Sequence, residues 1–371
     1  MAANTNLHKA KEAKNDEFYT QLTDVAKELM HYKHHFKDKV VFCNCDDPTW
    51  SAFWKYFHLN FAELGLKKLI STHYDRTEPT YKMEYYGGND NDVEEGIKTS
   101  LEGNGDFRNQ ECIELLKESD IVVTNPPFSC FRIYVSQLME YDKKFIIWSN
   151  NNAITYKEFF PLLKENKIWL GYTANKTLTF RIPNYYEKWD EKETQRINDG
   201  NHYAKVPAIS VFTNLDIPKR HEKLILWKNF KPEDYPRYDN YLAWNVDKVA
   251  EIPCDDYIDV EIDEAELSQY RQIYPDLEVL ENGKVRIHNP IYGVPITFLD
   301  KYNPEQFEIV GLGIANLGLA CGVQPYKPHH KQYRKEVQRK GQVDGDLYMV
   351  DKNDHPIVPY ARILICKKVG A

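Results

Sequence analysis

Residues 120–128 read Asp-Ile-Val-Val-Thr-Asn-Pro-Pro-Phe, and this stretch predicts how the chain folds. Its Ile-Val-Val run is apolar and β-branched, which is typical of a short strand buried on both faces of a parallel sheet. The two prolines that follow lack a backbone N–H, so the strand must end there. In an open α/β sheet, the residues that follow the carboxyl end of a strand line the ligand crevice. The stretch therefore predicts an α/β sheet with functional groups directly after this strand.

The residues Asn125, Pro126, Pro127 and Phe128 offer chemistry suited to binding a flat amine. The Asn125 side-chain oxygen and the Pro126 carbonyl can both accept from one exocyclic NH2 group, and the prolines hold these acceptors rigidly. Phe128 can stack on the ring that carries the amine. An ordinary exit loop with a packing phenylalanine explains the same four residues equally well. The rest of the chain has to decide between the two interpretations.

Predicted strands and helices alternate on both sides of this stretch, which is typical of a doubly wound sheet. Further strands are expected at residues 39–45, 68–71, 144–148, 167–172 and 207–213. The polar residues 76–100 are expected to form a long loop. After Asn214 the content of proline, charge and aromatic residues rises and the periodicity weakens. We therefore predict two domains, residues 1–216 and residues 217–371.

The composition is that of a mildly acidic globular chain. It has 371 residues and a formal net charge of −8, which argues against a purely electrostatic nucleic-acid binder but leaves room for a local basic patch. The seven cysteines are scattered without a CxxC pair or zinc-like spacing, and they predict reduced thiols in the cytoplasm. No apolar run approaches the ~18 residues of a spanning helix, so no membrane segment is expected.

Other predicted strand ends carry carboxylates and aromatic rings. These residues are Asp46, Asp47, Tyr74, Asp75, Asp106 and Phe107. An acidic side chain after the second strand suits ribose hydroxyls, and Asp106 with Phe107 can bind an adenine amine and its ring. Neither a G-x-G-x-x-G loop nor a Walker lysine is present, and carboxylates repel pyrophosphate. The crevice therefore favours S-adenosylmethionine, a cationic nucleoside without phosphate, over NAD or ATP.

The chain contains the motifs LHKAK, DEFYTQ, CNCDDP, KYF, LGLKKLI, GDFR, SDIVVTNPPFS, NAITYKE, ENKIWLG and GVPITFL followed by NPEQFE. Together these motifs resemble the EcoRI-type DNA adenine-N6 methyltransferases, a family that uses S-adenosylmethionine and carries an NPPF motif. They cover most of residues 7–172 and return in patches from about residue 207. The resemblance implies a Rossmann-like, mostly parallel sheet of seven strands. It also implies catalysis and cofactor binding in residues 1–216 and target recognition in residues 217–371.

The resemblance further implies roles for individual residues. The implied cofactor-binding residues are Phe18, Tyr19, Thr20, Asp46, Asp47, Pro48, Tyr74, Asp75, Asp106 and Phe107. The first three would close over the methionine part of the cofactor, and the next three stand where many methyltransferases have a glycine-rich loop. The remaining four would hold the ribose and the adenine. The implied catalytic residues are Asn125, Pro126, Pro127 and Phe128. Phe180 is expected as a second ring that stacks on the target base.

The implied reaction is methyl transfer to N6 of an adenine that flips out of double-stranded DNA. A monomer is expected, as the modification enzyme of a restriction–modification system or as an orphan or phage relative, and a cognate endonuclease would act separately. Two alternatives stay open. The same acceptors suit other sp2 amines, such as cytosine N4 in DNA, guanine N2 or adenine N6 in RNA, or a protein glutamine amide. The chain could also be a non-catalytic DNA-binding relative.

Basic residues in the second predicted domain are candidate DNA contacts. We single out Lys219, Arg220, Lys331 and Arg334. A solvated charged face explains any one of them as well. His329 and His330 adjoin this group, but no cysteine or carboxylate pattern partners them in the sequence. A nuclease-like magnesium site at Asp46 and Asp47 is disfavoured because no matching D…ExK arrangement accompanies it. No metal is therefore expected.

Overall fold

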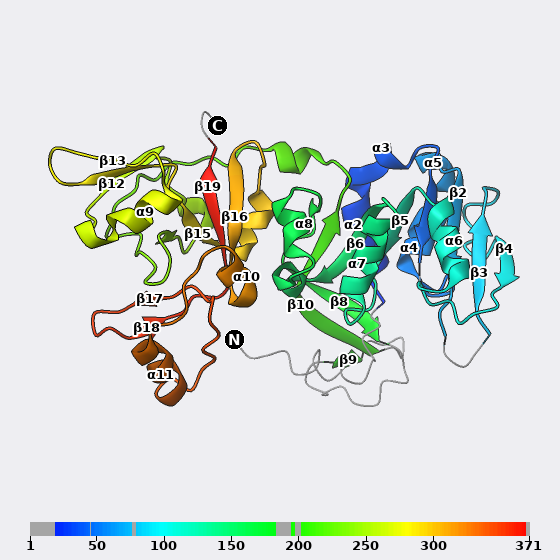
Figure 1. Cartoon of the computed structure of the whole chain (residues 1–371). Coiled ribbons are helices and arrows are strands. Elements are labelled where there is room, and N and C mark those ends of the chain that lie inside the picture. Colours follow the sequence, from blue (N-terminus) through cyan, green and yellow to red (C-terminus); the bar gives the residue numbers. More distant parts are fainter. Residues whose placement is uncertain (1–18, 45, 76–78, 183–193, 197–201, 369–371) are drawn as a thin grey trace. The chain divides into compact units, whose positions relative to one another are not determined.

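The computed structural model describes residues 19–44, 46–75, 79–182, 194–196 and 202–368 (Figure 1). The chain divides into two compact units. Unit 1 comprises Met1–Phe159 and Ile168–Ile217, and unit 2 comprises Phe160–Lys167 and Pro218–Ala371. None of the helices in the described part of the chain has the length and apolar character that crossing a membrane requires.

Unit 1 is built on one large sheet with the strand order β4-β3-β2-β1-β5-β6-β10-β7, and β8 and β9 also pair with β10. Its strands are β1 (Val40–Cys43), β2 (Lys68–Thr72), β3 (Tyr81–Tyr85), β4 (Ile97–Ser100), β5 (Ile121–Thr124), β6 (Lys144–Asn150), β7 (Trp169–Leu170), β8 (Lys176–Ile182), β9 (Thr194–Arg196) and β10 (His202–Thr213). The neighbours β2, β1, β5 and β6 run parallel. The predicted α/β sheet with parallel central strands is confirmed, whereas the number of seven strands is not: the described residues alone place ten in this sheet.

Helices cover both faces of the parallel strands. Those of unit 1 are α2 (Leu22–Leu29), α3 (Lys33–Phe36), α4 (Ala52–Leu59), α5 (Phe61–Leu64), α6 (Gln110–Glu118) and α7 (Phe131–Glu140). Two short helices, α4 and α5, follow the first strand and are separated by Asn60. The Ser51 hydroxyl caps α4 by accepting from the Trp54 N–H at 2.9 Å, and Gly65 ends α5 with a left-handed φ of 63°.

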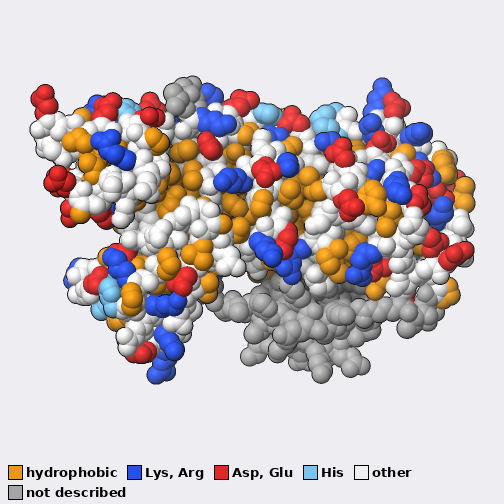
Figure 2. Space-filling model, in the orientation of Figure 1, with side chains coloured by type: hydrophobic (Ala, Val, Ile, Leu, Met, Phe, Trp, Pro, Cys, Tyr) orange, Lys and Arg blue, Asp and Glu red, His pale blue; other side chains and the backbone are white. Residues whose placement is uncertain are grey.

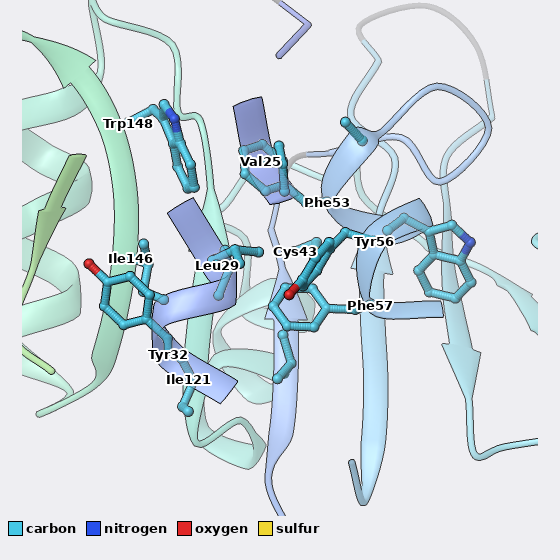
Figure 3. Close-up of a cluster of buried hydrophobic side chains, with 14 of the residues drawn as sticks. Val25, Leu29, Tyr32, Cys43, Phe53, Tyr56, Phe57, Ile121, Ile146 and Trp148 are labelled. Atoms are coloured by element: carbon cyan, nitrogen blue, oxygen red, sulfur yellow. The ribbon is translucent and has the colours of Figure 1, made fainter. Parts of the chain in front are cut away.

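The main core of unit 1 lies between the sheet and helices α2 and α4 (Figure 3). Alternate strand residues such as Ile121 and Trp148 point to this side, because successive side chains of a strand point to opposite faces. The Phe53 ring of α4 meets the Trp148 ring edge to face at 4.8 Å. On the opposite face, Phe131 of α7 packs against Phe212 of β10 at 6.0 Å. Burial of each such ring stabilises the fold by about 1.5–3 kcal/mol.

The polar stretch 76–100 was expected to be a loop, and this prediction is wrong in part. It contains the antiparallel strands β3 and β4, which extend the sheet beyond β2. The nearly buried Lys68 ammonium of β2 joins this extension to the rest of the sheet, because it pairs with Glu84 of β3 at 2.5 Å and with Glu118 of α6 at 2.7 Å. All four residues of β4 are exposed, so it lacks the apolar alternation that identifies a strand in a sequence.

Unit 2 contains smaller sheets and short helices. One sheet has the order β11-β15-β19-β16, a second has β12-β14-β13, and β17 pairs with β18. Its strands are β11 (Trp244–Asn245), β12 (Tyr257–Val260), β13 (Glu278–Val279), β14 (Val285–His288), β15 (Tyr292–Pro295), β16 (Phe307–Gly313), β17 (Met349–Val350), β18 (Pro356–Ile357) and β19 (Arg362–Lys367). Its helices are α8 (Phe160–Lys164), α9 (Leu267–Ile273), α10 (Ala315–Ala320) and α11 (Pro328–Glu336).

Candidate active site

The loop Asn125–Phe128 follows β5 at the centre of the parallel strands, as the sequence predicts. Pro126 is buried, and Asn125 and Pro127 are half-buried. The Pro127 carbonyl accepts from the Cys130 N–H at 2.9 Å, which turns the chain into α7. Phe128 is 7% exposed, so most of its ring surface is already covered. The loop therefore presents the Asn125 amide from a rigid backbone.

Asn44 links the carboxyl ends of three parallel strands, and the sequence reasoning missed it. It directly follows β1 and is buried. Its carbonyl accepts from the Thr124 hydroxyl of β5 at 2.9 Å, and its side-chain oxygen accepts from the Thr72 hydroxyl of β2 at 3.1 Å. Asn44 therefore fixes the exits of β1, β2 and β5 relative to one another. A lone asparagine after a strand carries no signal from which this role could be read.

Asp46 and Asp47 follow β1 but have different surroundings. The Asp46 carboxyl is buried, and its Oδ2 has no hydrogen-bond partner among the residues that the structure describes. Burial raises the pKa of Asp46 to about 8, the nearby Asp47 charge adds to this rise, and a hydrogen bond with Ser51 opposes it. Asp46 is therefore largely protonated at neutral pH.

The Asp47 carboxylate is already bound inside the protein. Its Oδ1 accepts from the Tyr81 hydroxyl and from the Thr49 hydroxyl, both at 2.8 Å, and its Oδ2 lies 3.3 Å from Nδ1 of His73. The Asp47 carbonyl also accepts from the Ser51 N–H at 2.7 Å, which leads into α4. Asp47 thus shapes the turn that begins at Pro48. The cofactor contact predicted for its side chain would have to share these partners.

The loop that carries Asp106 and Phe107 lies against the exit of β2. Gly105 has a φ of +72°, and a Cβ there would lie 2.1 Å from the carbonyl oxygen of His73, so only glycine allows this close approach. The Asp75 N–H donates to the Asn104 carbonyl at 3.2 Å. The structure therefore brings Tyr74, Asp75 and Asp106 to one edge of the sheet, as the sequence predicts.

Arg108 binds the side chain of Asp106, which the sequence reasoning did not foresee. Its Nε donates to Asp106 Oδ1 at 2.8 Å and its Nη2 to Oδ2 at 2.5 Å, and this bidentate pairing lowers the pKa of Asp106. Phe107 is 4% exposed, and its ring meets Tyr134 of α7 edge to face at 5.0 Å. An adenine at this position would therefore meet an Asp106–Arg108 pair and a ring that is already packed.

Tyr19 and Thr20 lie beside β8, and Phe18 lies outside the described residues. The Tyr19 N–H donates to the Arg181 carbonyl and its carbonyl accepts from the Arg181 N–H, both at 3.0 Å. The Arg181 guanidinium lies 4.3 Å from the centre of the Trp50 ring. These contacts join the N-terminal motif, β8 and the turn after Pro48 in one region of unit 1.

Phe180 does not fit its predicted role of stacking on a target base. Its side chain in β8 is 0% exposed and belongs to the hydrophobic core of unit 1. The adjacent Arg181 is only half-buried, because neighbours on a strand face opposite sides. The sequence does not reveal which side of β8 faces the core, so the prediction selected a core residue.

All four basic residues singled out in unit 2 have partners within the protein. Lys219 pairs with Asp300, Arg220 donates to the Asn166 side chain at 2.5 Å, and Lys331 pairs with Asp344 at 2.7 Å. Arg334 is 8% exposed, and its Nε and Nη2 donate to the Gly341 carbonyl at 3.1 and 2.8 Å. The prediction of Arg334 as a DNA contact is therefore not supported, because its buried guanidinium is already hydrogen-bonded to the carbonyl of Gly341, which follows α11 in the chain.

Other cations in residues 327–340, close to Arg334 in the chain, face the solvent. Lys335, Arg339 and Lys340 are exposed, and Lys and Arg side chains gather over α11 on the face shown in Figure 2.

A separate cavity of about 510 Å³ in unit 2 is lined by Lys164, Arg220 and other residues, none of which was predicted to be catalytic.

Comparison with known proteins gives one consistent result. The model of the family described as "Adenine-specific methyltransferase EcoRI" matches residues 6–272 and 286–368. Type II methyltransferase M.EcoRI from Escherichia coli is 44% identical over 324 residues, which cover 83% of this chain and 89% of M.EcoRI. Type II methyltransferase M.MpnI from Mycoplasma pneumoniae is 37% identical over 307 residues, which cover 82% of this chain and 84% of M.MpnI. No solved structure gives a significant match to the chain.

Proposed function

The chain belongs to the EcoRI family of adenine-specific methyltransferases, and from this premise we propose that it methylates N6 of an adenine flipped out of duplex DNA at a specific site. The observation that carries the proposal is the position of Asn125–Phe128, directly after β5 and between the neighbouring strands β1 and β6. In such sheets the ends of the parallel strands form the ligand crevice.

Members of a methyltransferase family require a methyl donor of the S-adenosylmethionine type, and the groups at the strand ends suit this molecule. S-adenosylmethionine would supply an electrophilic methyl group on a cationic sulfonium. The buried Asp46 carboxyl has an Oδ2 with no hydrogen-bond partner in the described part of the chain. It would accept from the cationic amino group of the cofactor and would ionise as that charge binds, because a nearby opposite charge lowers the pKa of a carboxyl. The close approach of Gly105 to His73, next to Asp75 and Asp106, supports the proposal that the ribose and adenine bind on this side.

We propose that Asn125 and Pro126 orient the attacking amine. Two acceptors that bind both hydrogens of one NH2 group favour a pyramidal nitrogen. The lone pair of that nitrogen can then point at the methyl carbon. The amine attacks a cationic centre, so no strong base is needed before the transfer, and positioning supplies most of the rate. Flipping the base costs about a few kcal/mol. Stacking on Phe128 would return about 1–3 kcal/mol, but only once the neighbours that now cover its ring move aside, because the side chain is 7% exposed.

We further propose that unit 2 reads the DNA, with Lys335, Arg339 and Lys340 as phosphate contacts. Their exposure supports this assignment over Arg334, whose guanidinium is used inside the protein. Contacts to phosphates set the register of a protein on DNA, whereas base contacts set its specificity. A role as the modification enzyme of a restriction–modification pair is part of the proposal, and the enzyme would act as a monomer.

The test is product identification. The full chain is incubated with methyl-labelled S-adenosylmethionine and, in parallel, with duplex DNA, structured RNA and a protein extract, and digested products are separated by mass spectrometry. We expect label in N6-methyladenine of duplex DNA, confined to one short sequence on mapping. Label in N4-methylcytosine, in RNA or in protein would contradict the proposal, and so would the absence of transfer to any substrate by a protein that binds the cofactor.

A further inference from the structure

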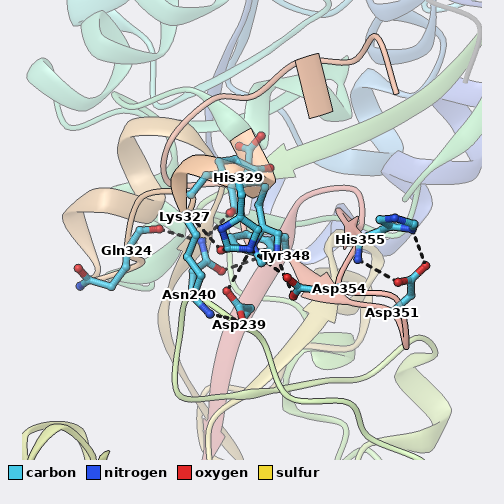
Figure 4. A network of polar contacts seen from close by, with 12 residues as sticks. Asp239, Asn240, Gln324, Lys327, His329, Tyr348, Asp351, Asp354 and His355 are labelled. Atoms are coloured by element: carbon cyan, nitrogen blue, oxygen red, sulfur yellow. Dashed lines mark hydrogen bonds and ion pairs between the residues drawn. The ribbon is translucent and has the colours of Figure 1, made fainter. Parts of the chain in front are cut away.

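His329, His330 and Asp354 converge in unit 2 and form a group that the proposed methyl transfer does not use (Figure 4). The two histidines stand at the start of α11, and Asp354 lies in the turn between β17 and β18. His329 Nε2 lies 3.0 Å from Asp354 Oδ2, and His330 Nε2 lies 3.0 Å from Asp354 Oδ1. Each residue thus offers one ligand atom, and these atoms all lie within 4.8 Å of one another.

The turn holds Asp354 in place without help from the histidines. Asp354 has a φ of 62°, a left-handed conformation that few residues other than glycine adopt, although aspartate and asparagine are among those that do. Its N–H donates to the Asp351 carbonyl at 3.0 Å, and the Asp351 side chain accepts from the backbone N–H groups of Asn353 at 2.8 Å and His355 at 2.9 Å. The carboxylate of Asp354 is therefore presented by a turn that is already ordered.

His330 has a second set of contacts behind its ring. Its side chain is 1% exposed, and its Nδ1 lies 3.2 Å from the Tyr348 hydroxyl and 3.8 Å from Asp239 Oδ2. Asp239 Oδ1 binds Lys327 at 2.8 Å, whereas the buried Oδ2 has no hydrogen-bond partner within the described residues. A histidine that binds a metal through Nε2 carries its proton on Nδ1 and usually donates it to a carboxylate, carbonyl or water behind it. Asp239 and Tyr348 occupy that position.

We propose that His329, His330 and Asp354 bind one divalent transition-metal ion of the zinc class, which joins the start of α11 to the β17–β18 turn. Zinc bonds of about 2.0–2.1 Å in a tetrahedral site place neighbouring ligand atoms about 3.3 Å apart. Each histidine lies 3.0 Å from a different oxygen of Asp354, and with one oxygen taken from Asp354 the three ligand atoms lie within 4.8 Å of one another. Two imidazoles with one carboxylate favour zinc over the oxygen-preferring Mg²⁺ and Ca²⁺. His329 and Asp354 are 59% and 63% exposed, so water can complete the coordination.

His329 and His330 have no partner close by in the sequence, because Asp354 is 24 residues from His330 along the chain. The ion would fix the helix that leads to the exposed Lys335, but its binding does not depend on the proposed methyl transfer.

The test is zinc binding by the full chain after removal of metals with a chelator and dialysis. Calorimetry and native mass spectrometry are expected to show one Zn²⁺ per chain and no comparable binding of Mg²⁺ or Ca²⁺. His329→Gln and Asp354→Asn should each weaken zinc binding by about 100-fold, and Asp239→Asn by about tenfold, as for a group that orients a ligand. His355→Asn is the matched control, since this histidine lies in the same turn and pairs with Asp351 at 3.4 Å; it should bind zinc as the unsubstituted chain does.

Hydrogen exchange gives an independent readout. Zn²⁺ should slow the exchange of backbone amides in residues 328–332 and 351–356 of the unsubstituted chain and of His355→Asn, but not of the variants that bind zinc weakly. His329→Gln is the decisive variant, since its exposed side chain can be lost without loss of the contact between His330 and Asp354. Circular dichroism checks that each variant is folded. The proposal is overturned if the chain takes up no stoichiometric Zn²⁺, or if folded His329→Gln and Asp354→Asn bind it as tightly as the unsubstituted chain.

Discussion

Residues of the loop Asn125–Phe128 in unit 1, and Lys331 and Arg334 of the basic segment 327–340 in unit 2, were chosen from the sequence as functional, but their surroundings in the structure differ. The loop lies where a strand ends within a parallel sheet, and its neighbours are the ends of β1 and β6. In the basic segment, Lys331 and Arg334 are bound by Asp344 and by the Gly341 carbonyl, whereas Lys335 is exposed.

This difference shows that the position of a loop after a strand is easier to predict from sequence than the role of a charged side chain on a helix. The pattern of a buried strand determines where its end lies, so a functional loop can be located from local sequence. The function of a lysine or arginine depends on whether a distant carboxylate or carbonyl already binds it, and long-range contacts decide this. Four predictions test the comparison, from the largest expected effect to the smallest.

The largest effect is expected for Asn125→Ala. Loss of one of the two acceptors that orient the amine should lower the rate of methyl transfer about 10²–10³-fold, by analogy with the loss of one preorganised hydrogen-bonding group in other enzymes. Cofactor affinity, measured by calorimetry, should change little. The exposed Asn282, in the turn between β13 and β14, offers a control, and Asn282→Ala should retain full activity. Near-normal transfer by Asn125→Ala would show that the loop is not catalytic.

Arg334→Ala should mainly reduce stability. The substitution removes two hydrogen bonds to the Gly341 carbonyl and one to Gln338 at 3.0 Å from a buried guanidinium. Hydrogen bonds of charged groups are worth about 1.5–3 kcal/mol each before relaxation, so we expect a loss of about 2 kcal/mol in the free energy of unfolding. Urea denaturation measures it, with Lys335→Ala as the neighbouring control. Equal stability of both variants would show that the buried Arg334 contributes no more to the fold than the exposed Lys335.

The buried carboxyl of Asp46 should make stability depend on pH. Its pKa is about 8 in the folded protein and near 3.8 when exposed, so between these values the folded state holds a proton that the unfolded chain has released. Stability contributed by this group is therefore lost as the pH rises from about 4 to about 8, by at most about 1.4 kcal/mol per pH unit. Asp46→Asn should remove this slope in denaturation curves, whereas Asp38→Asn, at an exposed turn, should retain it. An unchanged slope in Asp46→Asn would show that the carboxyl is ionised when buried.

The smallest effect is expected for Lys335→Ala on DNA binding. Loss of one phosphate contact should weaken binding a few-fold at all sequences and reduce the slope of log K against log salt by about one. Fluorescence anisotropy over a range of salt concentrations measures both quantities. Lys331→Ala is the comparison within the same helix, since Asp344 already neutralises Lys331. A larger salt-slope change for Lys331→Ala than for Lys335→Ala would reverse the proposed roles.

Much of the sheet could be predicted, and the failures have physical causes. Strands expected at residues 39–45, 68–71 and 144–148 correspond to β1, β2 and β6, because each is an apolar run. The strands β3 and β4 were missed because neither has a buried face that would impose an apolar pattern: β4 is the exposed edge of the sheet, and in β3 only Glu84 and Tyr85 are buried. Phe180 was misjudged because a strand with apolar residues does not reveal by itself which face meets the core.

The candidate site was located from the sequence, but its internal contacts were not. The carboxylates of Asp47 and Asp106 were expected to be available to a cofactor, whereas Tyr81, Thr49 and Arg108 bind them in the structure. Tyr81 is 34 residues from Asp47 and belongs to a strand that was not predicted. A partner that comes from an unrecognised element cannot be inferred from local pattern.

The sequence by itself determined the parallel core, the end of β5 just before Asn125, and the residue types on which the proposed amine binding by Asn125–Phe128 rests. These features depend on β-branched runs, on proline and on residue type, all of which act over a few neighbouring residues. Only the tertiary structure decided which polar groups are already bound. Asn44 accepts hydrogen bonds from Thr72 and Thr124, which follow it by 28 and 80 residues in the chain, and Asp354 contacts both histidines of α11. Such contacts arise when distant segments pack together, and no local pattern of residues encodes them.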